Sequence, residues 1–382
     1  MGDDRSMLSP RNPRISAMPE RGPPLIPSRS TLPGIQILRG IAAVLVVFHH
    51  ALEESLGAAS SWKSPDWLTT FGASGVDIFF VISGFIMIWV SFPRGGPAET
   101  PGRFLVKRIC RIYPFYWACL AFLLLLASVG FYKNLDRSAS TLLKSVLLLP
   151  NSHFLIGVAW TLVFEMYFYM LFTLTLFWRS AIVSAAVTTA LIMTMMLIGG
   201  TISDPELRDY LANPLVLEFC FGMALALSMR RMSLPTRWSW TLCIAGFAGL
   251  LAAPVFVPHA STNGLPPFPR LFVWGLPALL IVASSLSPTL KRAGTLSRLG
   301  VLTGDASYAI YLTHPFVMIT YAWLLKNVPF LSAVSQQPII PLVIAVSVGL
   351  GFVAHLYAEK PLIALARTLL ATPPSPARRP TG

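Results

Sequence analysis

Ten apolar stretches, each long enough to cross the hydrocarbon core of a bilayer, occupy most of this 382-residue chain. A helix needs about 20 apolar residues to span about 30 Å, and lipid permits only helices or closed barrels because every backbone polar group must be satisfied internally. The stretches lie near residues 35–52, 74–92, 114–131, 158–178, 180–199, 214–229, 238–257, 271–289, 306–325 and 338–358. They predict an all-α integral membrane protein, a bundle of about ten transmembrane helices.

Composition excludes a soluble protein of this length. Only 12% of the residues carry a charge and 54% are hydrophobic, whereas an average soluble domain is about 25% charged. The net charge of +13 would suggest a nucleic-acid partner in a soluble protein, but in a membrane protein basic residues gather in cytoplasmic loops, so no nucleic acid is expected. The four cysteines stand singly in or beside apolar stretches, and we expect neither disulfides nor a bound metal.

The two ends differ from the apolar middle. Residues 1–32 hold five Arg and six Pro and are interpreted as a disordered basic tail, and residues 366–382 as a Pro-rich tail. Residues 33–365 then form the ten-helix membrane domain. With the N-terminus inside, the inner segments contain 22 of the 29 basic residues, so the positive-inside rule places both termini in the cytoplasm.

The first apolar stretch carries two ionisable side chains on one face. Arg39 and His50 are 11 residues apart, which in a helix is three turns plus about 20°, with about 16 Å between them along the axis. The neighbouring His49 is rotated by about 100° from this stripe. Ionisable groups inside a membrane are costly and indicate function. Because His50 shares a face with Arg39, it is favoured over His49 as the functional residue, although a packing role remains the alternative for both.

Two later stretches also contain ionisable side chains. Glu165 lies several residues into an apolar helix, where it could act as a base, orient an imidazole or form a structural hydrogen-bond hub. His314 precedes Pro315 and lies one turn after Tyr311; a substrate donor and a packing residue are equally good interpretations. Asp77 begins the second stretch, where a helix N-terminus favours an anion.

A basic motif, RFLVKRICRIYP, precedes the third stretch, which Pro114 is expected to open. Arg103, Lys107 and Arg111 are spaced four residues apart, and Arg108 flanks them. The motif fits an amphipathic helix lying on anionic lipid. It fits equally well a cytoplasmic phosphate site, because the planar guanidinium binds phosphate with two hydrogen bonds.

In this order, the motifs resemble the acyltransferase-3 family of membrane acyltransferases, most of all the type that O-acetylates exopolysaccharides. The matching segments are Arg39 with His50, GVDIFFVISGF, Arg108 to Pro114, the WTL-x-x-E stretch that ends at Glu165, SYAIYLTHP, and the closing Glu359–Lys360–Pro361. The resemblance covers about residues 34–362.

The resemblance implies a transferase in the bacterial inner membrane that moves an acyl group, usually acetyl, from cytoplasmic acyl-CoA to a hydroxyl group of a surface or lipid-linked carbohydrate. It implies that Arg108 and Arg111, with Lys107, contribute to CoA binding and that Arg39 and His50 are essential. We expect His50 to be base or nucleophile, Glu165 to orient it and His314 to stabilise the oxyanion. Polysaccharide-assembly proteins are potential partners.

A transporter or flippase for a lipid-linked glycan is the alternative, since buried His and Glu also suit proton-coupled transport. Against it, the chain lacks two matching halves, and transport leaves the basic motif unexplained. The sequence leaves the acceptor, the acyl group and the oligomeric state open.

Overall fold

A computed structural model describes residues 32–55, 65–93, 96–131, 135–232, 234–256, 267–287 and 295–370. The predicted N-terminal tail lies outside these residues apart from Leu32. The C-terminal tail was predicted from residue 366, but residues 366–370 are the last residues of α17. Residues 371–382 are not among those described.

The described residues are helical, with no strand among them. The helices are α1 (Pro33–Ser55), α2 (Asp66–Ala73), α3 (Gly75–Ser91), α4 (Pro101–Ser128), α5 (Ala139–Leu147), α6 (Trp160–Thr175), α7 (Ala181–Thr201), α8 (Pro205–Leu211), α9 (Leu217–Met229), α10 (Thr236–Phe256), α11 (Pro267–Arg270), α12 (Leu276–Ser284), α13 (Thr295–Asp305), α14 (Ser307–Asn327), α15 (Pro329–Ala333), α16 (Ile339–Ala354) and α17 (Lys360–Leu370). Short 3₁₀ turns at Gly157–Ala159 and Pro214–Val216, and π-helical turns at Leu271–Gly275 and His355–Glu359, connect some of them.

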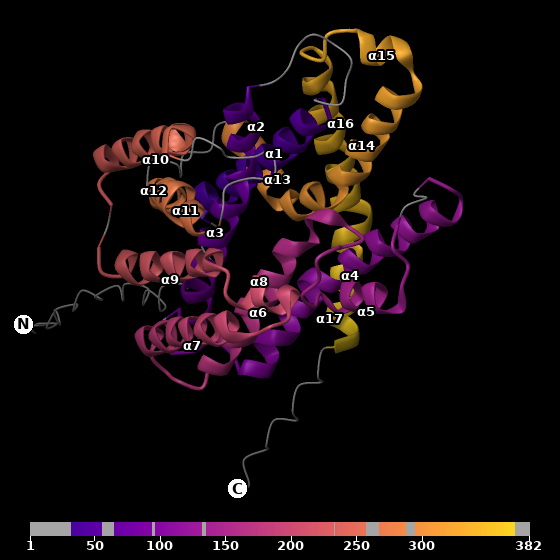
Figure 1. The fold of residues 1–382 in the computed structure, drawn as a ribbon. Helices are drawn as coiled ribbons and strands as arrows, with labels where there is room; N and C mark the ends of the chain where they lie inside the picture. The colour runs from indigo at the N-terminus through magenta and orange to yellow at the C-terminus, as the bar shows by residue number, and fades with distance from the viewer. Residues whose placement is uncertain are drawn as a thin grey trace, which may run out of the picture. The chain divides into compact units, whose positions relative to one another are not determined.

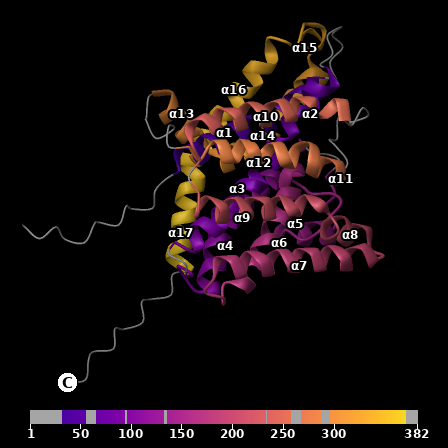
Figure 2. The ribbon, with the colours of Figure 1, turned by 90° about the vertical axis from the view of Figure 1, so that its left-hand side faces the viewer.

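The helical membrane bundle predicted from the sequence is confirmed. Within the described part of the chain, nine helical stretches are long and apolar enough to cross a membrane, judged by length and composition. The remaining predicted span, near 238–257, is also helical, as α10, but is not one of the nine. Figure 2 gives the view turned by 90° and shows four helices side by side, α7, α9, α12 and α10. Helices α13 and α17 lie at one end of these four, and α8 and α11 at the other.

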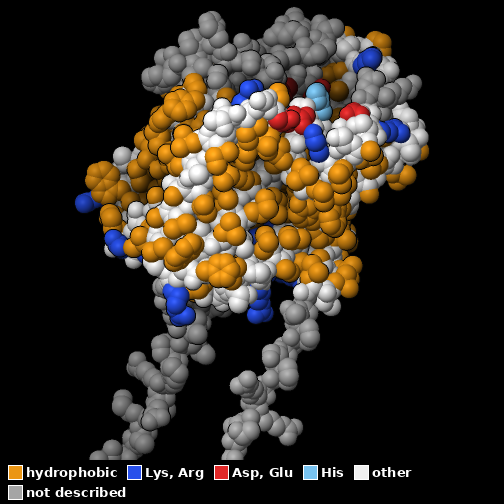
Figure 3. All heavy atoms as spheres, turned by 60° about the horizontal axis from the view of Figure 1, so that its bottom comes forward, with side chains coloured by type: hydrophobic (Ala, Val, Ile, Leu, Met, Phe, Trp, Pro, Cys, Tyr) orange, Lys and Arg blue, Asp and Glu red, His pale blue; other side chains and the backbone are white. Residues whose placement is uncertain are grey.

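The outer surface suits lipid. Large apolar side chains such as Phe177 and Leu197 are 74% and 75% exposed. In the face shown in Figure 3, hydrophobic side chains cover the middle, and Lys and Arg lie toward the edges. Such a surface is stable only against hydrocarbon, because water would leave its apolar area unburied.

Helix α1 is the central helix, packed against α3, α13, α14 and α16 (Figure 1). The helices also pack closely around Gly75 and Gly84. A Cβ atom at Gly84 would collide with the carbonyl oxygen of Phe219 on α9, and one at Gly75 with that of Ala42 on α1. Small residues at these crossings let the backbones approach, which is how membrane helices gain packing energy.

One expectation for a chain segment needs correction. Pro114 does not open a new helix: it lies inside α4, which starts at Pro101 and runs for 28 residues. Neighbouring helices and local adjustment let membrane helices tolerate an internal proline, so the basic motif and the apolar stretch form one continuous rod. The short helix α5 and an irregular connection lie between α4 and α6.

A buried ion pair joins α3 to the start of the π-helical turn before α12. Arg270 binds both carboxylate oxygens of Asp77, with Nε 2.9 Å from Oδ1 and Nη2 2.8 Å from Oδ2, and donates to the carbonyl of Ala73. Both side chains are buried. The helix-start role expected for Asp77 therefore accompanies a second role, neutralising Arg270 inside the bundle.

We expect Asp77→Asn to destabilise the protein by about 3–5 kcal/mol, because it removes the charged carboxylate to which the buried Arg270 is hydrogen-bonded. Thermal unfolding of the purified protein in detergent measures the loss. Asp209→Asn, at a side chain that is 72% exposed, is the matched control and should leave the midpoint unchanged. Equal midpoints for both variants would contradict a stabilising role for the pair.

Candidate active site

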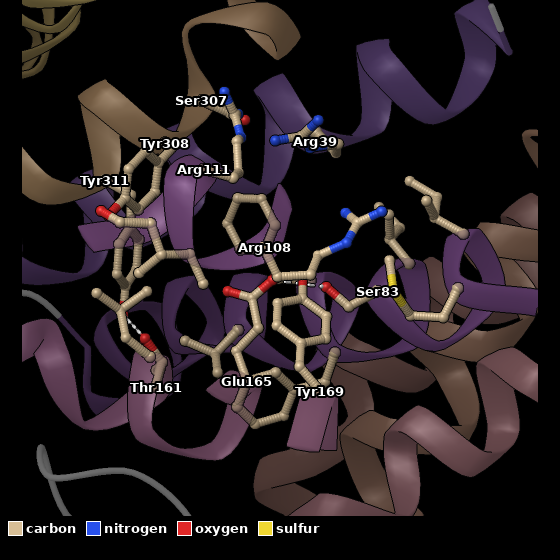
Figure 4. A pocket seen from close by; sticks show the side chains of 18 residues that line it. Arg39, Ser83, Arg108, Arg111, Thr161, Glu165, Tyr169, Ser307, Tyr308 and Tyr311 are labelled. Carbon is tan, nitrogen blue, oxygen red and sulfur yellow. Dashed lines mark hydrogen bonds between the residues drawn. The ribbon is translucent and has the colours of Figure 1, made fainter. Parts of the chain in front are cut away.

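A cavity of about 170 Å³ lies inside the bundle, among α1, α3, α4, α6 and α14. Its lining brings together side chains that are far apart in the chain (Figure 4). The polar side chains of the lining are Arg39, Ser83, Arg108, Arg111, Thr161, Glu165, Tyr169, Ser307, Tyr308 and Tyr311. Three arginines and one carboxylate face the same space, so the cavity is suited to an anionic ligand.

Each arginine is held differently. Arg39 donates from Nη1 to Oε1 of Gln36 (3.2 Å), and Gln36 is itself bonded to Asp305. The guanidinium of Arg108 lies over the rings of Phe104 and Tyr169, with its carbon 5.1 and 5.6 Å from their centroids. Arg108 Nε is buried and has no hydrogen-bond partner among the described residues.

Arg111 is the arginine with a carboxylate partner. Its Nη1 donates to Oε1 of Glu359 at 2.6 Å, and its guanidinium carbon lies 5.5 Å from the Tyr308 ring centroid. Because α4 is continuous, Arg108 and Arg111 are one turn apart on one rigid helix.

Lys107 does not share this position. Its ammonium group pairs with Glu99, and it is not part of the cavity lining. The expected anion-binding set of three residues is therefore divided: Arg108 and Arg111 line the cavity, and Lys107 faces an acid outside it. On a helix, residue 107 is rotated about 100° from residue 108.

Glu165 lies in the arginine cavity and not beside the imidazoles. Ser83 Oγ and the Tyr169 hydroxyl both donate to its Oε1, the first at 3.3 Å. Figure 4 shows Glu165 and Tyr169 across the pocket from Arg39 and Arg111. We expected Glu165 to orient His50, but no hydrogen bond joins the two side chains in the described part of the chain. The Glu165 carboxylate instead offsets part of the positive charge of the arginines.

The imidazoles form a second cluster beyond the cavity. The ring of His50 lies 4.8 Å from that of His49 and 5.0 Å from that of His314, between centroids. His50 Nδ1 is 3.0 Å from the Val46 carbonyl oxygen. When this nitrogen donates, Nε2 keeps a lone pair, which is the state that a general base needs. The fold thus brings His50 and His314, 264 residues apart in the chain, into ring contact.

His314 is fully buried, and neither of its ring nitrogens has a hydrogen-bond partner among the described residues. Tyr311 separates it from the arginines: this ring lines the cavity and lies 5.9 Å from the His314 ring. The Tyr311 hydroxyl is held by the Val158 carbonyl at 3.0 Å and by Thr161 at 2.8 Å. A tyrosine therefore stands between the arginine cavity and the histidines.

His49 has the hydrogen bonds of a structural residue. Its Nδ1 lies 2.6 Å from the Thr69 carbonyl oxygen, and its Nε2 lies 3.5 Å from Glu53 Oε2. His49, His50 and Glu53 are the described residues that could hold a metal ion, with ligating atoms within 4.8 Å of one another. Zinc ligands in a tetrahedral site are about 3.3 Å apart, so metal binding would require these side chains to move closer together.

Four residues of the site were not predicted from the sequence as site residues: Ser83, Tyr169, Tyr308 and Glu359. Tyr169 follows Glu165 by one helical turn, the spacing at which side chains on a helix meet, and this was the available signal. Glu359 belongs to the closing motif, but nothing in its sequence position indicates a contact with Arg111, 248 residues earlier.

Comparisons with known proteins agree with this site. Residues 32–357 match the model of a family described as an acyltransferase domain, Acyl_transf_3. The chain is similar to the exopolysaccharide production protein ExoZ of Rhizobium meliloti, with 34% identity over 66% of this chain and 78% of that protein. It is also similar to the acyltransferase MdmB of Streptomyces mycarofaciens, with 25% identity over 91% of this chain and 96% of that protein. No solved structure matched the chain.

Proposed function

Because the chain belongs to the acyltransferase-3 family and is a multi-pass membrane acyltransferase, we propose that it transfers an acyl group, acetyl in the simplest case, from cytoplasmic acyl-CoA to a hydroxyl group of a surface or lipid-linked carbohydrate. The printed name of the Rhizobium relative, an exopolysaccharide production protein, supports the carbohydrate acceptor. The positive-inside distribution of Lys and Arg supports an inner-membrane location with both termini in the cytoplasm.

The observation that carries the proposal is the cavity lined by Arg39, Arg108 and Arg111. CoA has three phosphate groups, which bind best to planar guanidinium groups that offer two hydrogen bonds each. A helix that only bound anionic lipid would need basic side chains on the protein surface, and arginines that point into the bundle would not contribute to such binding. The phosphates would bind at Arg108 and Arg111, and the thioester end would extend along α1 from Arg39 toward His50.

The distance along α1 fits this arrangement. Arg39 and His50 are separated by about 16 Å of helix, which the extended pantetheine arm of CoA can cover. Tyr311 lies on this route, so the thioester would pass beside its ring to reach the imidazole. The acceptor would meet His50 from the side of His49 and His314, and donor and acceptor would thus approach from opposite sides of Tyr311.

At His50 the reaction needs one base. Nε2 removes the proton of the acceptor hydroxyl as its oxygen attacks the thioester carbonyl. The carbon–sulfur bond then breaks, and the CoA thiolate takes the proton from the imidazolium. In the two-step form, Nε2 itself attacks the thioester carbonyl, and the carbon–sulfur bond breaks to release the CoA thiolate. The acceptor oxygen then attacks the acyl-histidine, the carbon–nitrogen bond breaks to restore the imidazole, and the acceptor's proton passes to the CoA thiolate. His314, one of the two imidazoles beside His50, would donate to the oxyanion from its protonated ring nitrogen.

His50→Ala should lower the rate of transfer by about 10²–10⁴-fold, the usual contribution of a positioned base, and leave membrane insertion intact. Release of free CoA thiol in membranes supplied with acetyl-CoA and the host's polysaccharide measures transfer, and the yield of monodisperse protein in detergent measures insertion. Transfer at the wild-type rate by inserted His50→Ala protein would remove His50 from the mechanism.

Arg108→Gln and Arg111→Gln should each raise the KM for acyl-CoA by about ten- to a hundredfold, because each removes charge-assisted hydrogen bonds to phosphate. Initial rates at varied acetyl-CoA concentration provide the KM values. Arg298→Gln, at an exposed arginine of α13, is the matched control. If neither cavity variant changed the KM, the motif would act on lipid instead.

A further inference from the structure

Glu359 connects the arginine cavity to the C-terminal helices. Its Oε1 accepts from Arg111 Nη1 at 2.6 Å, and its side chain is fully buried. It ends the π-helical turn His355–Glu359, between α16 and α17, and α17 packs against α4. A carboxylate in this environment is stable only while its charge is compensated and its lone pairs are bonded.

His355 supplies the second bond to this carboxylate. Its Nδ1 lies 2.6 Å from Glu359 Oε2, so an imidazole N–H donates to the oxygen that Arg111 does not use. The His355 ring is buried, and its Nε2 has no partner among the described residues. The carboxylate is thus held from both sides and can present only one oxygen, in one direction, to Arg111.

Arg108 and Arg111 consequently differ in what they offer a ligand. The charge of Arg111 is balanced by Glu359, whereas Arg108 is held by two aromatic faces and has no carboxylate partner among the described residues. The Arg111 side chain remains 31% exposed, so donors that do not contact Glu359 are open to a ligand. A hydrogen bond that fixes one side of a guanidinium restricts the side chain before any ligand binds. Less conformational entropy of the arginine is therefore lost when a phosphate binds.

We propose that His355 and Glu359 are positioning residues for the acyl-CoA site: His355 fixes Glu359, Glu359 fixes the guanidinium of Arg111 at the cavity, and Arg108 supplies the unbalanced positive charge. This inference rests on the proposed function, because it takes CoA as the ligand. A purely structural role, tying α17 to α4, is the competing explanation and predicts loss of stability without selective loss of CoA binding.

The experiment measures CoA binding by isothermal titration to the full-length protein in detergent. His355→Leu removes the donor and should weaken CoA binding by about tenfold, within the range of coupled neighbouring residues. His355→Asn places an amide N–H near the position of Nδ1 and should restore binding to within about twofold. Binding by His355→Leu at wild-type affinity would overturn the proposal, as would equal losses of affinity in both variants together with lower unfolding temperatures.

Double variants show whether the effect passes through Arg111. In the Arg111→Gln background, His355→Leu should cause no further loss of CoA affinity, because the group it positions is absent. In the Arg108→Gln background the two losses should add, since Arg108 does not contact Glu359. Additive losses in both backgrounds would overturn the proposal.

If His355→Leu does not fold, Glu359→Asp gives the same comparison. It keeps the charge and withdraws the carboxylate by one methylene, so it should weaken CoA binding in the wild-type background and have no effect with Arg111→Gln. An unchanged affinity for Glu359→Asp alone would reject the positioning role. A wild-type protein that does not bind CoA would instead reject the proposed function, and the positioning role with it.

Discussion

Charge inside a bilayer must be compensated, and this constraint organises the interior of the bundle. A lone ionised group in hydrocarbon costs several kcal/mol, and two of the buried charged groups are compensated by contacts between distant segments: Asp77 with Arg270, and Glu359 with Arg111. Each contact ties a helix near the start of the chain to one much later, and each therefore helps to select one packing of apolar helices that lipid alone would not distinguish.

The need to compensate buried charge also distinguishes the structural side chains from those proposed to act on a ligand. Once the ion pairs are assigned, two arginines remain in the cavity without a direct carboxylate hydrogen bond among the described residues, Arg39 and Arg108, and Glu165 faces them across it. Two imidazoles remain beyond Tyr311, His50 and His314, in ring contact with each other. The proposed anion site and the proposed base site, at either side of one tyrosine, are what a transferase needs if its donor is a polyanion and its acceptor a neutral hydroxyl.

Much of this could be predicted from the sequence because it depends on local periodicity. Apolar length fixed the helices, and the 11-residue interval placed Arg39 and His50 on the same helix. The basic motif gave two arginines that line the cavity, Arg108 and Arg111, but also Lys107, which does not, since spacing alone does not show which of two adjacent helical positions faces inward. The pairs Asp77–Arg270 and Arg111–Glu359 could not be predicted, because their members are 193 and 248 residues apart and only tertiary packing joins them. Nor does the sequence show that Glu165 would contact Ser83, 82 residues earlier, in place of an imidazole.

The proposed function requires acyl-CoA as the donor and a carbohydrate as the acceptor of the acyl group. The most direct measurement supplies acetyl-CoA, radiolabelled in the acetyl group, to membranes that contain the protein and to membranes that lack it, and follows label into the polysaccharide fraction. We predict label in carbohydrate only when the protein is present, and its release by mild alkali, as expected of an ester. Equal label in both preparations, while acetyl-CoA stays intact, would contradict the account and favour transport of a glycan over its acylation.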